Sequence, residues 1–382
     1  MATNSARNPG IDLLRGLSIL LVILNHVGIR IRLMDGVLAR VLPKQVLTDI
    51  TFNGWEGVFI FFVISGFLIA TNSIQRWGGL SAMDVRTFYV RRASRIVPCL
   101  VALVAILSAL DLAHVPDYVI RPPQSLTHAV ASAFGLYLNW YEAHTGYLPA
   151  NWDVLWSLSI EEVFYLGFPL VCLSLRRDWI LAPVLALLAL LQPLALKSIV
   201  GNPIWLEKAY LPGMAAIAAG VLAAIVASHL ASNKRWLRIA LIVFGACGVF
   251  ADLGFEDNFF HWIGFWVLFL LTISAACLVL GFHLQLRAVP GWSLWGTGWL
   301  QSFGRLSYEI YLTHMFVVLA FVRVFKMSHA GSRWGVLWYL PAIGLAWVLG
   351  WLVAKYFSGP CERLVRQKLM KSKKTGDAKA TA

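Results

Sequence analysis

The segment Arg15-GLSILLVILN-His26, in the first apolar stretch of the chain, constrains the fold more than any other. As an α-helix, its residue steps turn through about 1100°, close to three full turns, so Arg15 and His26 share one helix face. At a rise of roughly 1.5 Å per residue, they lie about 16 Å apart along the axis. Ionisable side chains are costly in lipid and mark functional sites by default. The alternative to a functional site is a structural one: Arg15 would snorkel to the membrane surface, and His26 would hydrogen-bond a neighbouring helix.

The composition is that of an integral membrane protein. Apolar residues make up 59% of the 382 positions and charged residues only 13%, with a mean hydropathy of +0.71. Average soluble domains carry about 25% charged residues. The net charge of +13 could indicate nucleic acid, but Lys and Arg cluster at the ends of apolar segments. That pattern indicates membrane topology and anionic lipid contact, so we expect a bilayer partner and no nucleic acid.

The cysteines give no sign of a metal site or a disulfide framework. They are scattered, mostly in apolar runs, without the spacing of a zinc site. The five are Cys99, Cys172, Cys247, Cys277 and Cys361. We therefore expect no metal. The first apolar run has no small-residue cleavage site behind it, so we expect a retained span rather than a signal peptide.

Ten apolar stretches are long enough to cross about 30 Å of hydrocarbon as helices. They lie near residues 11–32, 53–75, 95–114, 155–176, 179–198, 209–231, 236–253, 262–283, 300–325 and 334–357. With the N-terminus inside, most Lys and Arg residues fall in cytoplasmic connections, as the positive-inside rule requires. The sequence predicts an all-α, polytopic membrane protein with both ends cytoplasmic. One transmembrane domain would fill residues 1–360, followed by a basic cytoplasmic tail over 361–382.

The longest connection runs from about 115 to 154 and is rich in proline, Trp and Tyr. Within it, the run from Leu126 to Trp140 is apolar enough to be re-entrant or interfacial, but it is short for a span. An aromatic outer loop could cover a site or stack on sugar rings. The alternative is an interfacial aromatic belt.

Two cytoplasmic-half motifs suggest a ligand. The Ser65-Gly66 pair in the second span allows close approach of a helix or a cofactor, packing being the simpler explanation. Arg91, Arg92 and Arg95 crowd a short helical segment that Pro98 follows. Arg91 and Arg95 are i and i+4, and like charges so placed repel, which favours a bound multivalent anion such as phosphate. The alternatives are a topology signal and lipid headgroup binding.

Two further spans carry acids and a polar stripe. Adjacent Glu161 and Glu162 could complement a helix dipole. They cannot share one face, however, so at least one is expected to point into the bundle. Counted from the outer surface, they lie near the depth of His26, which predicts an orienter–base pair. The ninth span carries four polar residues, Ser307, Tyr308, Tyr311 and His314. Ser307, Tyr311 and His314 share one helix face at i, i+4 and i+7, a polar stripe expected to line a ligand path or to bond another helix.

Taken in order, Arg15-x10-His26, FFVISGFL, RRASRIVP, WSLSIEEVFY and GRLSYEIYLTH resemble the motifs of membrane-bound acyltransferase family 3. The family acylates cell-surface glycans and some small molecules. The resemblance implies a ten-helix O-acetyltransferase that takes an acyl group, commonly acetyl, from cytoplasmic acetyl-CoA. The acceptor would be a hydroxyl of an extracytoplasmic polysaccharide or glycolipid, such as a lipid-linked sugar, at a bacterial inner membrane. Some members carry an extra periplasmic domain; with no room for one here, the membrane domain is expected to act alone.

The resemblance also implies roles for individual residues. Arg15 and His26 match the signature pair, and Glu161 matches the acid of its motif. The acyl-CoA phosphates would contact Arg91, Arg92 and Arg95, with Arg15 at the mouth of the path and the pantetheine arm along the Arg15–His26 face. His26 would act as general base, oriented by Glu161, or alternatively form an acyl-His intermediate. The substrate path would include Ser65, Glu162, Ser307, Tyr308, Tyr311 and His314, of which Ser65, Tyr308 and Tyr311 are oxyanion-donor candidates.

Two other functions remain open from the sequence. A small-molecule acceptor is poorly separated from a glycan, because the outer loops carry no readable code. A secondary transporter or flippase with a His/Glu proton relay belongs to another class. Such folds usually show two related halves, and the sequence shows no such symmetry.

Overall fold

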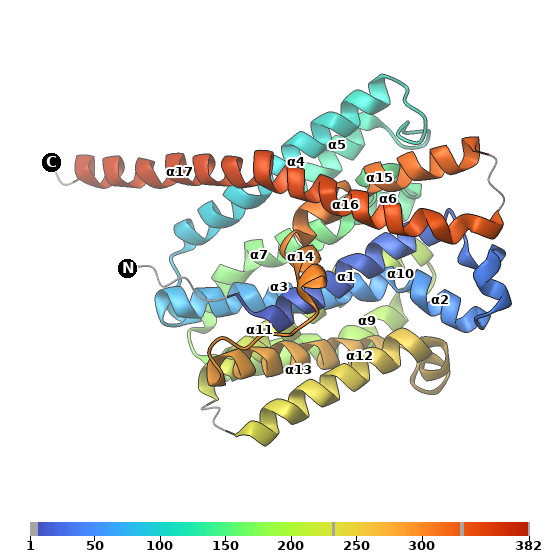
Figure 1. Ribbon diagram of the computed structural model, residues 1–382. Helices are drawn as coiled ribbons and strands as arrows, with labels where there is room; N and C mark the ends of the chain where they lie inside the picture. The colour runs from blue at the N-terminus through green and yellow to red at the C-terminus, as the bar shows by residue number, and fades with distance from the viewer. Residues whose placement is uncertain (1–6, 231–233, 329–331, 381–382) are drawn as a thin grey trace.

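A computed structural model describes residues 7–230, 234–328 and 332–380, which form a bundle of long helices (Figure 1). Over those ranges there is no β-strand, and ten helical segments are long and apolar enough to cross a membrane. The predicted fold class and number of spans are thereby confirmed. Both termini lie at the same end of the bundle, as an even number of crossings requires. We call this the terminal end and the other the distal end.

The elements that cross the bundle are α1 (Pro9–Gly28), α3 (Gly54–Trp77), α4 (Val85–Leu112), α7 (Leu155–Leu175), α8 (Asp178–Leu190) with α9 (Gln192–Ser198), α10 (Pro203–Lys208) with α11 (Tyr210–His229), α12 (Arg235–Ile263), α13 (Trp266–Ala288), α15 (Ser307–Met327) and α16 (Tyr339–Val353). The last continues through a π-helical turn (Ala354–Ser358) into α17 (Gly359–Ala380). Shorter helices are α2 (Lys44–Phe52), α5 (Leu126–Phe134), α6 (Leu138–Thr145) and α14 (Gly298–Arg305). Single 3-10 turns cover Leu33–Asp35, Val37–Arg40, Leu80–Ala82, Ala150–Trp152 and Ser332–Trp338.

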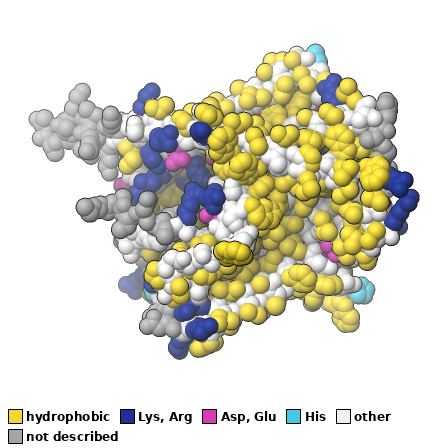
Figure 2. Space-filling model, viewed as in Figure 1, with side chains coloured by type: hydrophobic (Ala, Val, Ile, Leu, Met, Phe, Trp, Pro, Cys, Tyr) yellow, Lys and Arg dark blue, Asp and Glu magenta, His cyan; other side chains and the backbone are white. Residues whose placement is uncertain are grey.

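The surface separates into the zones that a bilayer demands. Lys and Arg side chains gather at the terminal end, with a smaller group at the distal end (Figure 2). Between them the surface is mostly hydrophobic. Such a band leaves the charged groups at the two water interfaces.

Helices pack in this bundle through glycines where backbones meet. A Cβ on Gly66 of α3 would lie 2.0 Å from the carbonyl oxygen of Ile217. A Cβ on Gly220 of α11 would lie 1.9 Å from the carbonyl oxygen of Val63. Small residues are needed at such crossings because, in lipid, close van der Waals packing holds helices together. The Ser65-Gly66 pair therefore has a packing role, through Gly66.

The third span begins earlier than the predicted residue 95. Helix α4 starts at Val85, where the Asp84 side chain accepts a hydrogen bond of 2.6 Å from the Thr87 amide. Pro98 lies inside the helix rather than after it. A proline is tolerated within a membrane helix because neighbouring groups satisfy the freed backbone carbonyl. The three arginines therefore belong to the spanning helix itself.

The ninth span is broken rather than continuous from residue 300. Helix α14 ends at Arg305, Leu306 leaves helical geometry, and α15 starts at Ser307. A Cβ on Gly304 would lie 1.8 Å from the Asp12 carbonyl oxygen, so only glycine lets α14 sit against α1. The break consequently brings Ser307 beside α1.

Helix α17 packs against α4 at its start, and it runs on from α16 through the π-helical turn. The expected boundary at residue 360 falls within this continuous helix. The division into a domain and a tail stays a prediction. The side chains of residues 371–382, where several tail lysines lie, fall outside the described residues.

The long connection before α7 forms two short helices, α5 and α6, neither long enough to cross a bilayer. Its end does not stay at the surface. Asn151 and Trp152 are fully buried, and the Asn151 side chain donates to the Leu312 carbonyl oxygen at 2.8 Å. Helix α7 therefore starts inside the bundle.

Candidate functional site

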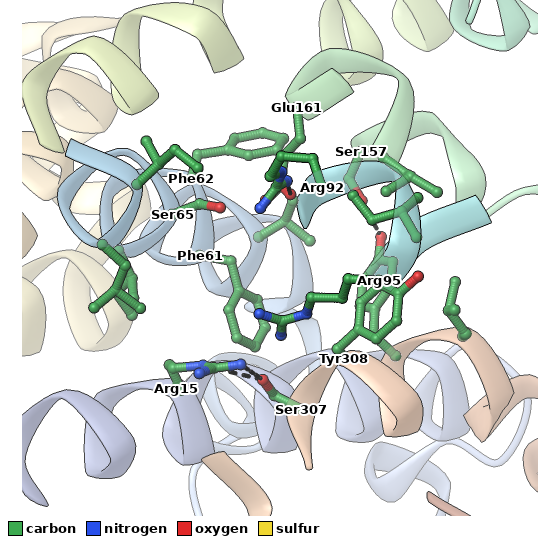
Figure 3. A pocket seen from close by; sticks show the side chains of 18 of the residues that line it. Arg15, Phe61, Phe62, Ser65, Arg92, Arg95, Ser157, Glu161, Ser307 and Tyr308 are labelled. Atoms are coloured by element: carbon green, nitrogen blue, oxygen red, sulfur yellow. Dashed lines mark hydrogen bonds and ion pairs between the residues drawn. The ribbon is translucent and has the colours of Figure 1, made fainter. Parts of the chain in front are cut away.

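A cavity of about 190 Å³ opens between α1, α3, α4, α7 and α15 (Figure 3). Its polar lining contains most of the residues selected from the sequence motifs: Arg15, Ser65, Arg92, Arg95, Glu161, Ser307, Tyr308 and Tyr311. Asn72 and Ser157 add two polar groups that the motifs did not single out as site residues. Residues far apart in the chain thus meet in one cavity.

Two arginines of the cavity are available for an anion. Arg15 donates to the Ser307 hydroxyl from Nε at 3.2 Å and from Nη2 at 2.8 Å, which fixes the guanidinium. Arg95 is exposed and reaches toward Arg15 and Phe61 (Figure 3). Its guanidinium carbon lies 5.5 Å from the Tyr308 ring centroid, and it has no ion pair with a described residue. Two cationic forks with few competing partners suit a phosphate or diphosphate group.

Arg92, in contrast, is already neutralised. Its Nη2 lies 3.0 Å from Glu162 Oε1 and 4.0 Å from Glu161 Oε2. Its guanidinium carbon stacks 3.8 Å from the centroid of the Tyr165 ring. The Tyr165 hydroxyl in turn shares a hydrogen bond with Ser65. Arg92 therefore acts first as the counter-ion that keeps two carboxylates inside the bundle, because unpaired charges there are costly.

Arg91 lies apart from the cavity. Its charged neighbours are Arg76, Arg366 and Glu362, so it faces α17. Arg91 therefore does not share the cavity lining with Arg95, and its role in anion binding stays a prediction. Arg92 and Arg95, three residues apart, share the cavity face instead.

Two tyrosines of α15 line the distal part of the cavity. Tyr311 accepts a hydrogen bond from Ser157 at 2.7 Å and donates to the Val154 carbonyl oxygen at 3.0 Å. The Tyr308 hydroxyl is buried without a partner among the described residues. Tyr311 is fully engaged and the Ser65 hydroxyl already bonds Tyr165, so Tyr308 is the better candidate to donate to a developing oxyanion.

His26 and His314 lie beyond the tyrosines, outside the cavity lining. Their ring centroids are 5.1 Å apart, and the His314 ring lies 5.9 Å from that of Tyr311. Nδ1 of His26 and Nε2 of His314 are buried without hydrogen-bond partners in the described structure. Two facing imidazoles with unused nitrogens are a candidate proton-transfer pair.

The helix backbone fixes the tautomer of His314. Its Nδ1 lies 2.8 Å from the Tyr311 carbonyl oxygen and 3.1 Å from that of Ile310. Both neighbours can only accept, so Nδ1 carries the proton, and in the neutral ring Nε2 is left as a lone-pair acceptor. The unused Nε2 of His314 can therefore accept a proton from a neighbour.

The predicted pairing of Glu161 with His26 is wrong. Glu161 contacts Arg92 and lies within hydrogen-bonding reach of Ser65, while the group beside His26 is His314. The depth estimate failed because it counted from a helix start at the surface. Since the turn before α7 is already buried, Glu161 lies at the level of the arginines. Glu162 pairs with Arg92 and does not line the cavity.

Sequence reasoning missed Tyr165 and a buried cluster at the distal end. Tyr165 follows Glu161 by four residues, so helical spacing could have revealed it. In the cluster, Lys208 of α10 lies 2.8 Å from Glu142 of α6 and also bonds Asp153. Glu142 and Asp153 lie in the long connection before α7 and Lys208 lies in α10, so no sequence spacing connects them.

The cavity lining combines cations with neutral hydroxyls. Among the residues that the structure describes, no group of three or more His, Cys, Asp or Glu side chains could hold a metal ion. The arginines can bind an anionic group, and the hydroxyls can donate to a carbonyl oxygen.

Comparison with known proteins gives a consistent picture. The sequence model of a family described as "Acyltransferase domain" matches residues 8–356. Staphylococcus aureus "Putative O-acetyltransferase SACOL0978" (strain COL) is 30% identical over 175 residues, 44% of this chain and 25% of that protein. "O-acetyltransferase OatA" of S. aureus NCTC 8325 is 31% identical over 174 residues, 43% of this chain and 24% of that protein. The matches thus span about a quarter of each relative. No solved structure matches the chain.

Proposed function

Because this chain belongs to the acyltransferase domain family matched over residues 8–356, acyltransferase 3, we propose that it transfers an acyl group across a membrane. The donor would be a cytoplasmic acyl-CoA, most simply acetyl-CoA. The acceptor would be a hydroxyl of an extracytoplasmic glycan or glycolipid. The observation that carries this proposal is the order of groups through the bundle: free arginines in the cavity, then hydroxyls, then paired histidines.

The terminal end of the bundle would face the cytoplasm. Both termini lie there, and on the face that Figure 2 shows Lys and Arg side chains gather there, which is the charge asymmetry that sets orientation. The phosphates of the donor would contact Arg15 and Arg95. The acyl-thioester arm would then extend past Tyr308 toward the histidines. In a bacterium this membrane would be the inner membrane.

The transfer step follows from the two histidines. His26 would remove the proton of the acceptor hydroxyl as its oxygen attacks the thioester carbonyl carbon. The carbon–sulfur bond then breaks, and the CoA thiolate takes the proton from His26. In the transfer step the Nδ1–H of His26 would donate a hydrogen bond to His314 Nε2, which fixes the tautomer in which His26 Nε2 is the base. The developing oxyanion would be stabilised by the Tyr308 hydroxyl.

The test is release of CoA from acetyl-CoA by protein in lipid nanodiscs. Charge-assisted contacts contribute about 1.5–3 kcal/mol, so Arg95→Gln and Arg15→Gln should each raise KM for acetyl-CoA by about 10- to 100-fold. Arg91→Gln is the matched control and should change KM less than threefold, since Arg91 faces α17. His26→Ala should bind acetyl-CoA but turn it over about 10²–10⁴-fold more slowly.

Two results would contradict the proposal. Equal KM values for acetyl-CoA in the Arg95→Gln and Arg91→Gln variants would show that Arg95 does not bind the donor. Movement of a substrate across the membrane by purified protein without consumption of acyl-CoA would favour a transporter instead.

A further inference from the structure

A second cavity, of about 390 Å³, lies in the long connection between α4 and α7. Its lining combines an acid, a base, an amide and an aromatic ring: Asp117, Arg121, Gln124 and Tyr147, between Pro116 and Pro149. We call it the loop groove. Neither Asp117 nor Arg121 forms a side-chain hydrogen bond or ion pair with a described residue. Their polar atoms are therefore free for a ligand.

The loop groove is held in a fixed shape. The Gln124 side chain donates to the Gly146 carbonyl oxygen at 2.6 Å and to the Thr145 hydroxyl at 3.2 Å, which ties its two walls together. Asp117 has a φ of +71°, a left-handed turn conformation that aspartate adopts more readily than most residues other than glycine.

Tyr147 gives the groove an exposed aromatic face. Its side chain is 53% exposed, although its hydroxyl donates to Glu207 Oε2 at 2.8 Å. The Lys208 ammonium lies 4.5 Å from the ring centroid. The ring is thereby anchored at its hydroxyl and on one side, while the rest of it stays open to a flat, apolar partner surface.

The loop groove lies at the distal end of the bundle, where α1 also ends, two residues after His26. The Arg30 guanidinium donates to the His26 carbonyl oxygen at 2.9 Å. Burial lowers the pKa of Arg30, and the carboxylates of Asp153 and Asp117 oppose this shift, so both acids lie within electrostatic range. Arg30 therefore bonds the helix end that carries His26 and lies within electrostatic range of Asp117 in the groove.

These features select one class of ligand. Asp117 and Arg121 have opposite charges, so a strongly charged ligand of either sign would meet one repulsive partner. A neutral ring with several hydroxyls can donate to Asp117, accept from Arg121 and lay its apolar face on Tyr147. We propose that the loop groove binds a pyranose of the acceptor at the end of the bundle where α1 carries His26. This inference rests on the proposed acyl transfer.

The test measures CoA release from acetyl-CoA in nanodiscs, with and without methyl pyranosides of glucose, galactose, mannose and N-acetylglucosamine. At least one pyranoside should accelerate release, whereas sorbitol, an acyclic polyol, should not. Asp117→Ala, Arg121→Gln and Tyr147→Ala should each lower pyranoside-dependent release at least 10-fold relative to the same variant's release to water. Tyr147→Phe, which keeps the ring, should change it less than threefold. An alkyl glucoside anchored in the nanodisc shows whether the acceptor sugar belongs to a glycolipid or to a polysaccharide. A KM lower than that of methyl glucoside indicates a glycolipid, and an equal KM indicates a polysaccharide.

Matched controls use exposed residues at the distal end that do not line the groove. Trp140→Ala removes an exposed aromatic ring of the same connection, and Arg40→Gln removes an exposed cation. Release to water without acceleration by any pyranoside would overturn the groove assignment while leaving the acyl transfer intact. Acceleration that Asp117→Ala and Tyr147→Ala do not reduce would also overturn it. Absence of any CoA release, in contrast, would contradict the acyl transfer itself.

Discussion

The substitution His314→Asn tests the histidine pair. The Asn side-chain amide can still donate to the Tyr311 carbonyl oxygen, as Nδ1 does at 2.8 Å. It lacks any atom in place of Nε2, the acceptor that would hold the Nδ1 proton of His26. General base catalysis contributes roughly 10²–10⁴-fold, so kcat should fall by that factor, equivalent to about 2.7–5.4 kcal/mol of transition-state stabilisation.

The same substitution should leave acetyl-CoA binding and the folding of the protein largely unchanged. His314 does not line the donor cavity, so KM for acetyl-CoA should stay within about threefold. Because the backbone hydrogen bond is kept, unfolding stability should fall by less than about 2 kcal/mol. The assay is steady-state CoA release with a saturating acceptor, together with thermal unfolding in nanodiscs. His283→Asn is the matched control: this histidine packs on Phe67, 5.3 Å between ring centroids, outside the site.

A double substitution separates a shared role from two independent ones. If His26 and His314 act as a unit, adding His314→Asn to His26→Ala should reduce kcat by less than threefold further. A folded His314→Asn protein with kcat within threefold of wild type would refute the reasoning. Losses that multiply in the double variant would show that the two histidines act separately.

Three further outcomes are expected. Gly66→Ala should lower the free energy of unfolding by at least about 1–3 kcal/mol, because the new Cβ would lie 2.0 Å from a backbone oxygen. Gly167 has open space around it, so Gly167→Ala should change the free energy of unfolding by no more than about 0.5 kcal/mol. Thermal unfolding of both variants makes the comparison. Lys208→Met should cost about 3–5 kcal/mol, because the buried Glu142 carboxylate and the partly buried Asp153 carboxylate lose their cation. Glu142→Gln should cost less, since Lys208 keeps Asp153. Chemical denaturation would compare the two variants, and equal losses would contradict the argument from the buried Lys208–Glu142 pair. Arg92→Gln should destabilise the protein similarly and leave the acetyl-CoA KM less affected than Arg95→Gln, and an equal rise in KM would show that Arg92 contacts the donor.

The amino-acid sequence alone determined the membrane fold. A segment that crosses lipid must be a long apolar helix whose backbone groups are hydrogen-bonded within the helix. Each stretch meets this condition through its own residues, so the ten spans could be counted from the sequence. The residues of the cavity could also be selected, because polar groups in an apolar helix are costly and stand out. Arg15, Ser65, Glu161 and Ser307 were all identified in this way.

Only the tertiary structure decided which of these residues meet. Helical spacing placed Arg91 with Arg95, but the orientation of α4 against its neighbours turned Arg92 into the cavity. Counting from the surface paired Glu161 with His26, but the buried turn before α7 lowered Glu161 to the arginines and left His314 beside His26. Depth and rotation depend on how helices pack through glycines and loops. These contacts join residues distant in sequence, so no local pattern encodes them.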